Sequence, residues 1–228
     1  MNGFTMFDAT HCYWLLFIGI FFIFLLYSYR KLTISKKLLV QKIFFFSLLL
    51  LELSKQCYLI FTDSYSYWSL PLHLCGMGIF IIGWHTYKPN KVTAEILYAL
   101  TLPGALAALI FPGWTNEPLF GFIHFNSFFF HILLVGYVLM LLAAKELRPN
   151  VKNLQYAVLF LLLTVPPIYF YNHTFGTNFM FINLPLKGSP LELFESWLGN
   201  PGYLIGFTGL VMILWVVMYS PFIKNKKR

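Results

Sequence analysis

The sequence predicts an all-α fold: a polytopic membrane bundle of seven transmembrane helices, with the N-terminus outside and the C-terminus inside. Hydrophobic residues make up 59% of the 228 residues and charged residues only 11%, whereas a soluble domain carries about 25% charged residues. Seven apolar segments approach the roughly 20 residues that a helix needs to cross a bilayer. The basic residues lie almost entirely in alternate loops, as the positive-inside rule requires.

At this length the chain is expected to form one membrane domain, residues 1–228. The third of its predicted spans is short, and we expect an irregular outer end there. A short amphipathic helix is predicted in the last outer loop, with Ser189 as its N-cap, Pro190 at its first position and Leu198 near its end. The predicted spans are residues 11–29, 39–60, 71–87, 94–111, 123–144, 154–172 and 202–221.

The orientation follows from the positions of lysine and arginine. With the N-terminus outside, the exceptions among the basic residues are Lys55, inside the second span, and Lys187, in the last outer loop. The net charge of +8 therefore reflects membrane topology and not a nucleic-acid site. The inner basic residues are Arg30, Lys31, Lys36, Lys37, Lys42, Lys88, Lys91, Lys145, Arg148, Lys152, Lys224, Lys226, Lys227 and Arg228.

Other common site types find no support in the sequence. It contains no zinc-ligand spacing, phosphate-binding glycine loop or dinucleotide fingerprint, so we expect neither a metal nor a cofactor. The cysteines, Cys12, Cys57 and Cys75, form no Cys-x-x-Cys pair, which argues against a disulfide framework. Asp8 stands where a signal peptide would carry basic residues, so a cleaved signal peptide is not expected.

Polar side chains within the predicted spans gather in their outer halves, and the inner halves are nearly pure hydrocarbon. Because intramembrane polar groups are costly and usually face the bundle interior, this pattern predicts a polar chamber near the outer surface. The chamber residues are Glu52, Lys55, Gln56, His73, Cys75, His124, Asn126, His131, Asn172 and His173.

Within this set, Cys75 and His131 are the candidate catalytic residues. Cys75 lies in the segment Leu70–Gly76, where Pro71 is expected in the first turn of the third helix. A thiol beside an imidazole can ionise and form a thioester, and His131 lies at a similar predicted depth. His73 is a candidate orienting residue. Alternatively, Cys75 is a small buried apolar side chain with no chemical role.

Four further residues are candidates for binding or orienting a substrate. Glu52 and Lys55 are three residues apart on one helix and can pair; the pair either holds the second helix against its neighbours or binds a substrate headgroup or relays protons. Asn172 and Asn178 either bind substrate carbonyls or satisfy backbone groups of a re-entrant loop.

The ordered set of motifs resembles the YwaF-like integral membrane proteins of bacteria, and it runs from the second span to the seventh. Two positions depart instead from the pattern of a eukaryotic branch that resembles this family: Phe179 stands where that branch is expected to have tyrosine, and residues 199–203 stand where it has a tryptophan-rich stretch. The matching motifs are Glu52-Leu53-Ser54-Lys55, Leu70-Pro71-Leu72-His73-Leu74-Cys75, Phe111-Pro112-Gly113, His131, the segment Asn172–Phe181, Leu193-Phe194, and Gly199-Asn200-Pro201-Gly202-Tyr203.

A eukaryotic branch that resembles this family includes a transmembrane acyltransferase of ether phospholipids. The resemblance implies a coenzyme-A-independent transacylase that uses Cys75 and His131, with membrane phospholipids or lysolipids as partners and the bacterial cytoplasmic membrane as its location. The alternatives are a small-molecule or lipid transporter, or a non-enzymatic membrane scaffold. The acyl donor, the acceptor and the oligomeric state do not follow from the sequence.

Overall fold

The computed structural model describes residues 3–223, and the regular structure within that range is entirely helical. Most elements are α-helices, and short 3-10 turns precede or connect several of them. The elements are α1 (Ala9–Arg30), α2 (Ile34–Phe61), η1 (Tyr67–Ser69), α3 (Leu74–Tyr87), α4 (Lys91–Ile96), η2 (Leu97–Thr101), α5 (Leu102–Ile110), α6 (Phe122–Ala143), η3 (Val151–Asn153), α7 (Leu154–Phe175), η4 (Phe179–Phe181), α8 (Pro190–Leu198) and α9 (Tyr203–Ile223).

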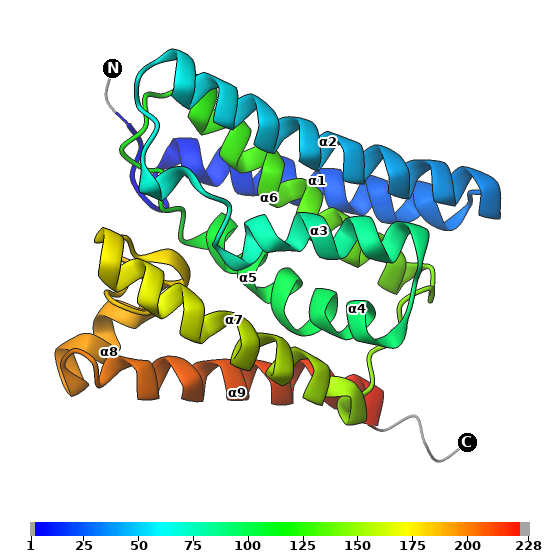
Figure 1. Cartoon of the computed structure of the whole chain (residues 1–228). Coiled ribbons are helices and arrows are strands. Elements are labelled where there is room, and N and C mark those ends of the chain that lie inside the picture. Colours follow the sequence, from blue (N-terminus) through cyan, green and yellow to red (C-terminus); the bar gives the residue numbers. More distant parts are fainter. Residues whose placement is uncertain (1–2, 224–228) are drawn as a thin grey trace.

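Helix α6 is the centre of the packing, because α1, α2, α3 and α5 all contact it. Figure 1 shows α1, α2 and α6 running together, with α3, α4 and α5 in the middle and α7 and α9 on the opposite side. The N-terminus, the end of α2 and helix α8 lie at one end of the bundle, which we call the N-terminal end (Figure 1). The turn between α1 and α2 lies at the other end, which we call the opposite end.

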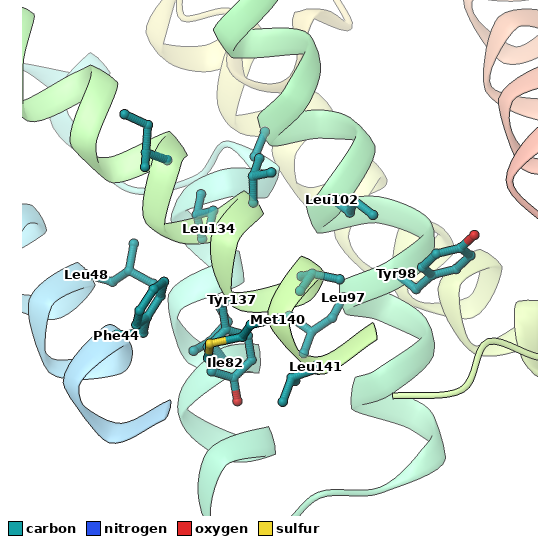
Figure 2. Close-up of a cluster of buried hydrophobic side chains, with 14 of the residues drawn as sticks. Phe44, Leu48, Ile82, Leu97, Tyr98, Leu102, Leu134, Tyr137, Met140 and Leu141 are labelled. Carbon is teal, nitrogen blue, oxygen red and sulfur yellow. The ribbon is translucent and has the colours of Figure 1, made fainter. Parts of the chain in front are cut away.

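Apolar side chains of four segments meet near the centre of the core. Figure 2 shows Phe44 and Leu48 of α2, Ile82 of α3, Leu97 of η2 and Leu134 of α6 gathered around one another. All five are buried. By contrast, α1, α7 and α9 bury few of their side chains, as expected for helices that face lipid.

The predicted apolar segments are confirmed as helices, and six of them are long enough to span a membrane by length and composition. The third is shorter: α3 has 14 residues, or about 21 Å at 1.5 Å per residue, against about 30 Å of hydrocarbon. The six candidate spans are Ala9–Arg30, Ile34–Phe61, Lys91–Ile110, Phe122–Ala143, Val151–Phe175 and Tyr203–Phe222.

The prediction that Pro71 lies in the first turn of the third helix is wrong. His73 is the N-cap of α3, so Pro71 lies before the helix, in a bend that the Leu72 N–H closes on the Leu70 carbonyl. This bend folds back over the first turn: a Cβ placed on Gly76 would lie 2.5 Å from the Pro71 carbonyl oxygen. Only a residue without a Cβ allows this approach. The expected irregular outer end is therefore present, and it is a folded segment.

Helix α4 continues into α5 through the π-helical turn η2. Pro103 lacks the N–H that would bond to the carbonyl of Ala99, four residues earlier. The indole Nε1–H of Trp215 donates to that carbonyl instead, at 2.9 Å. Proline thus creates a free acceptor inside the bundle, and α9 is fastened to it.

The predicted amphipathic helix is also confirmed, as α8. Ser189 Oγ accepts a hydrogen bond from the Leu191 N–H at 3.2 Å, and Pro190 occupies the first helical position. Leu191 is buried, whereas Trp197 and Leu198 are exposed at the N-terminal end. Helix α8 packs along α9.

Candidate functional site

Cys75 is the second residue of α3, at the N-terminal end of the bundle. Its side chain is half-buried and packs against the apolar core. Helix α3 contacts both α2 and α6, so the helices that carry Lys55, Cys75 and His131 are neighbours. Within residues 3–223, no hydrogen bond joins Cys75 Sγ to the His131 ring.

The stretch before α3 positions His73. Its Nδ1 accepts a hydrogen bond from the Met180 backbone N–H at 3.2 Å, and its ring packs edge-on against Phe179, with the centroids 5.1 Å apart. Because Nδ1 is the acceptor, the proton of the neutral imidazole lies on Nε2. His73 therefore presents an N–H donor at Nε2.

His131 has the opposite proton arrangement. Its Nδ1 lies 2.7 Å from the carbonyl oxygen of Ser127, and a carbonyl oxygen can only accept. Nδ1 must then carry the proton, and Nε2 of the neutral ring carries the lone pair. Helix α6 thus presents an imidazole whose Nε2 can act as a base.

Trp114, in the loop between α5 and α6, stacks on the His131 ring with the centroids 5.0 Å apart and the planes 14° apart. The sequence gives no sign that these two residues meet. The loop itself is held by the N-terminal segment, because the Phe4 N–H donates to the Thr115 carbonyl at 3.0 Å.

The predicted pair on α2 forms. Glu52 is buried, and its Oε2 lies 2.9 Å from Lys55 Nζ. Its Oε1 accepts from Gln56 Nε2 at 2.5 Å, and the same amide donates to the Ser69 carbonyl at 2.7 Å. Through the Gln56 amide, Glu52 therefore also helps to tie α2 to the segment that leads into α3.

The two histidines and the lysine come together although they lie far apart in the sequence. Lys55 and His131 are both near enough to His73 to act on it electrostatically, and Lys55 acts in the same way on His131. A cation, a base and an N–H donor thus lie in electrostatic range of one another near the start of α3. In the described range, 3–223, no cluster of His, Cys, Asp or Glu has the arrangement of a metal site.

The two asparagines use their side chains on the protein's own backbone. Asn172 is fully buried; its Oδ1 accepts from Thr177 Oγ1 at 2.8 Å and from the Phe179 N–H at 2.9 Å, and its Nδ2 donates to the Phe179 carbonyl at 2.9 Å. Asn178 bonds in a similar way to the backbone of Asn183 and Leu184. Both side chains thus fold residues 176–184, the segment that supplies the Met180 N–H to His73.

The expectation that the half of the bundle away from this site is nearly pure hydrocarbon is wrong. Glu95 of α4 is buried and bonds to the Tyr219 hydroxyl of α9. Thr86 of α3 bonds to the Tyr137 hydroxyl of α6 at 2.9 Å. An ionisable residue in an apolar span is a visible signal, and Glu95 could have been singled out on that ground.

Two histidines that the sequence leaves without a role hold helices together. His11 is fully buried; its Nδ1 accepts from the Phe7 N–H and its Nε2 donates to the Leu109 carbonyl, each at 2.9 Å. His85 bonds to Thr93 at 2.7 Å. His124, also fully buried, accepts a hydrogen bond from the Trp14 indole at 3.0 Å and so also joins helices within the core.

Comparisons with known proteins place the chain in a family. Neither the curated proteins nor the solved structures contain a match to it. A family model described as the TMEM164 family matches residues 6–219, which covers every helix from α1 to α8 and most of α9. This family comprises membrane proteins, in agreement with the six long apolar helices. The chain therefore belongs to the TMEM164 family.

Proposed function

We propose that this protein is a membrane acyltransferase that moves a fatty acyl chain from a phospholipid to a lipid acceptor through a thioester on Cys75. The observation that carries the proposal is a pair of neutral imidazoles with opposite tautomers. His73 carries its proton on Nε2 and His131 carries its proton on Nδ1, and the two rings lie in electrostatic range of each other near the start of α3. A base together with an N–H donor is the equipment that acyl transfer requires.

The first half-reaction loads the cysteine. His131 Nε2 takes the proton of the Cys75 thiol, and the sulfur attacks the ester carbonyl of the donor phospholipid. His73 Nε2–H donates to the oxygen that becomes negative. When the tetrahedral intermediate collapses, the carbon–oxygen ester bond breaks, the lysophospholipid oxygen takes the proton from His131, and the acyl group remains on Cys75 as a thioester.

The second half-reaction unloads it. His131 removes a proton from the acceptor hydroxyl, whose oxygen attacks the thioester carbonyl. The carbon–sulfur bond breaks and Cys75 recovers the proton from His131. No oxidant, metal or coenzyme A is consumed, because one ester is exchanged for another.

The first turn of α3 supports the role of Cys75. In the part of the chain that the structure describes, no side chain caps this helix. The N–H groups of the first turn, including that of Cys75, and the positive end of the helix dipole therefore favour negative charge there. This arrangement stabilises negative charge on the oxygen of a tetrahedral intermediate that forms beside Cys75.

The remaining candidate residues have supporting roles. Glu52 and Lys55 shape the headgroup end of the site, with Lys55 placed to attract a lipid phosphate. Asn172 and Asn178 hold the segment that orients His73. We further propose seven crossings, including the short α3, with the N-terminus outside, as the apolar segments and basic residues predict. The resemblance to the bacterial YwaF-like proteins supports the bacterial cytoplasmic membrane as the location.

The test uses purified protein in phospholipid vesicles with a radiolabelled acyl donor and an added lysolipid. We expect acyl transfer and a hydroxylamine-sensitive label on the parent protein, and neither with Cys75→Ala. Cys57→Ala, which removes an exposed cysteine of α2, is the matched control and should behave like the parent. Transfer by Cys75→Ala would overturn the covalent mechanism, and movement of lipid across the vesicle without transfer would favour a transporter.

A further inference from the structure

The charge that forms on His131 has no carboxylate to balance it. Nδ1–H is bonded to the Ser127 carbonyl, and among residues 3–223 the ion pairs are Lys37–Glu146 and Glu52–Lys55. The charged and titratable groups that act on the site are Lys55, whose partner is Glu52, and His73. None of them supplies a negative charge that is free to stabilise an imidazolium.

The indole of Trp114 lies flat against His131, whereas the ring of Phe130 meets the imidazole edge-on. Its plane is 14° from that of the imidazole, with the centroids 5.0 Å apart. The face of an indole is negative and attracts cations within about 6 Å of its centroid, most strongly where water is excluded. A parallel stack also restricts rotation of the imidazole, so that Nδ1–H stays on Ser127 and Nε2 keeps its lone pair.

Trp114 is itself held rigidly. Phe128 packs edge-on against it, with the centroids 5.2 Å apart and the planes at 89°. The loop that carries it is bonded to the N-terminal segment through Thr115, and His11 fastens α1 to the end of α5 just before that loop. The indole is therefore fixed from two sides, as a residue that orients another side chain must be.

We propose that Trp114 is the positioning residue of His131: its ring holds the imidazole in the Nδ1–H tautomer and stabilises the imidazolium that forms when Nε2 accepts a proton. This inference rests on the proposed function. It assigns to an aromatic face the role that a carboxylate plays beside the histidine of a Ser-His-Asp triad.

The test compares Trp114→Leu with Trp114→Phe. Leucine removes the aromatic face, whereas phenylalanine retains a ring that can stack. The indole Nε1–H is buried and donates to no atom within the described residues 3–223, so the phenylalanine variant loses no hydrogen bond of the protein. For Trp114→Leu we expect kcat of acyl transfer to fall about tenfold, or about 1.4 kcal/mol, with KM near that of the parent. Trp114→Phe should retain most of the kcat of the parent.

A second readout does not depend on acyl transfer. In protein labelled with 15N-histidine, the His131 signals, assigned with a His131→Asn variant, should report the Nδ1–H tautomer in the parent and in Trp114→Phe, and a mixture of tautomers in Trp114→Leu. The matched control is Trp14→Leu. Trp14 stacks on Phe128 in the same aromatic cluster but bonds to His124, so its loss should leave the His131 tautomer unchanged.

The outcomes separate the two proposals. An unchanged tautomer and an unchanged kcat in Trp114→Leu would overturn the role of Trp114. Loss of the His131 Nδ1–H tautomer to the same extent in Trp14→Leu would also overturn the role of Trp114, because the effect would then come from the packing of the whole aromatic cluster. Failure of the parent to transfer acyl groups would instead count against the proposed function. The 15N measurement of the His131 tautomer would still test whether Trp114 orients His131.

Discussion

The Nδ1–H group of His131 donates to the carbonyl oxygen of Ser127, one helical turn earlier, at 2.7 Å. This bond fixes which ring nitrogen carries the proton. It also leaves Nε2 without a partner among residues 3–223, so the tautomer follows from the backbone of α6 and not from a neighbouring acid. His73 shows the complementary case, in which a backbone N–H fixes the lone pair on Nδ1.

The first prediction concerns His131→Asn. The asparagine amide lies close to the position of the imidazole Nδ1–H, so the bond to Ser127 is retained while the base is lost. We expect acyl transfer in vesicles to fall about 10²–10⁴-fold in a protein that still folds. The control, His85→Asn, removes another buried imidazole, which lies in the last turn of α3 and bonds to Thr93 of α4. It should lower stability but leave the rate of acyl transfer unchanged. A parent-level rate in His131→Asn would exclude His131 as the base.

The second prediction concerns Asn172→Ala. The substitution leaves the N–H and carbonyl of Phe179 without their partner in a fully buried position. Each unsatisfied buried group costs about 1–3 kcal/mol, so for these two groups we expect a loss of about 2–6 kcal/mol in the free energy of unfolding, measured in detergent. Asn116→Ala, at an exposed position, should change it by less than about 0.5 kcal/mol. Equal stability of the two variants would contradict the anchoring role.

The helices could be predicted from apolar length alone, and their connections could not. Pro71 is compatible with a first helical turn, but the fold places it in a chain reversal that depends on Gly76. The partners that define the site are far apart in the sequence: His73 bonds to Met180, 107 residues away. No local pattern indicates such a contact. A freed carbonyl before Pro103 could be foreseen, whereas its donor, Trp215, could not.

The third prediction uses the pH dependence of the Asp8 cap on α1. The backbone N–H of His11, and then that of Thr5, donate to its carboxylate at 2.8 Å and lower the pKa of Asp8 below its usual value. A lowered pKa in the folded state stabilises the protein above the pKa of the unfolded state, and this stabilisation disappears as pH falls through the folded-state value. Thermal denaturation should therefore show a loss of stability on acidification that is smaller in Asp8→Asn. Identical slopes for the two proteins would contradict this.

The fourth prediction concerns Gly76→Ala. The added methyl group would meet the Pro71 backbone, and backbone cannot move aside as a flexible side chain can. We expect a loss of about 1–3 kcal/mol in stability and a reduced rate of transfer, because His73 shifts relative to Cys75. Gly104→Ala is the matched control: its Cβ meets nothing within 4 Å, and alanine in a helix is favoured over glycine by about 0.5–1 kcal/mol. Equal tolerance of both substitutions would show that the bend at Pro71 does not depend on Gly76.

The last prediction compares two ion pairs with the same N–O distance, 2.9 Å, at the two ends of the bundle. In the Glu52–Lys55 pair, Glu52→Leu or Lys55→Met alone leaves a charge without its partner among apolar helices. The double variant should therefore lose less free energy of unfolding than the sum of the losses in the two single variants. We expect a coupling energy of about 1–3 kcal/mol. If Lys55 also attracts the lipid phosphate, every variant that lacks it should raise KM for the phospholipid donor.

The Lys37–Glu146 pair is the control for this experiment. It joins α2 to the loop after α6, and Tyr29 and Gln41 also donate to the Glu146 carboxylate. Its substitution by Lys37→Met and Glu146→Leu should lower stability and leave KM unchanged, because the pair lies at the opposite end of the bundle from Cys75. A rise in KM of equal size in both sets would mean that ion pairs affect transfer only through stability. The headgroup role of Lys55 would then be wrong, although the thioester on Cys75 would still stand.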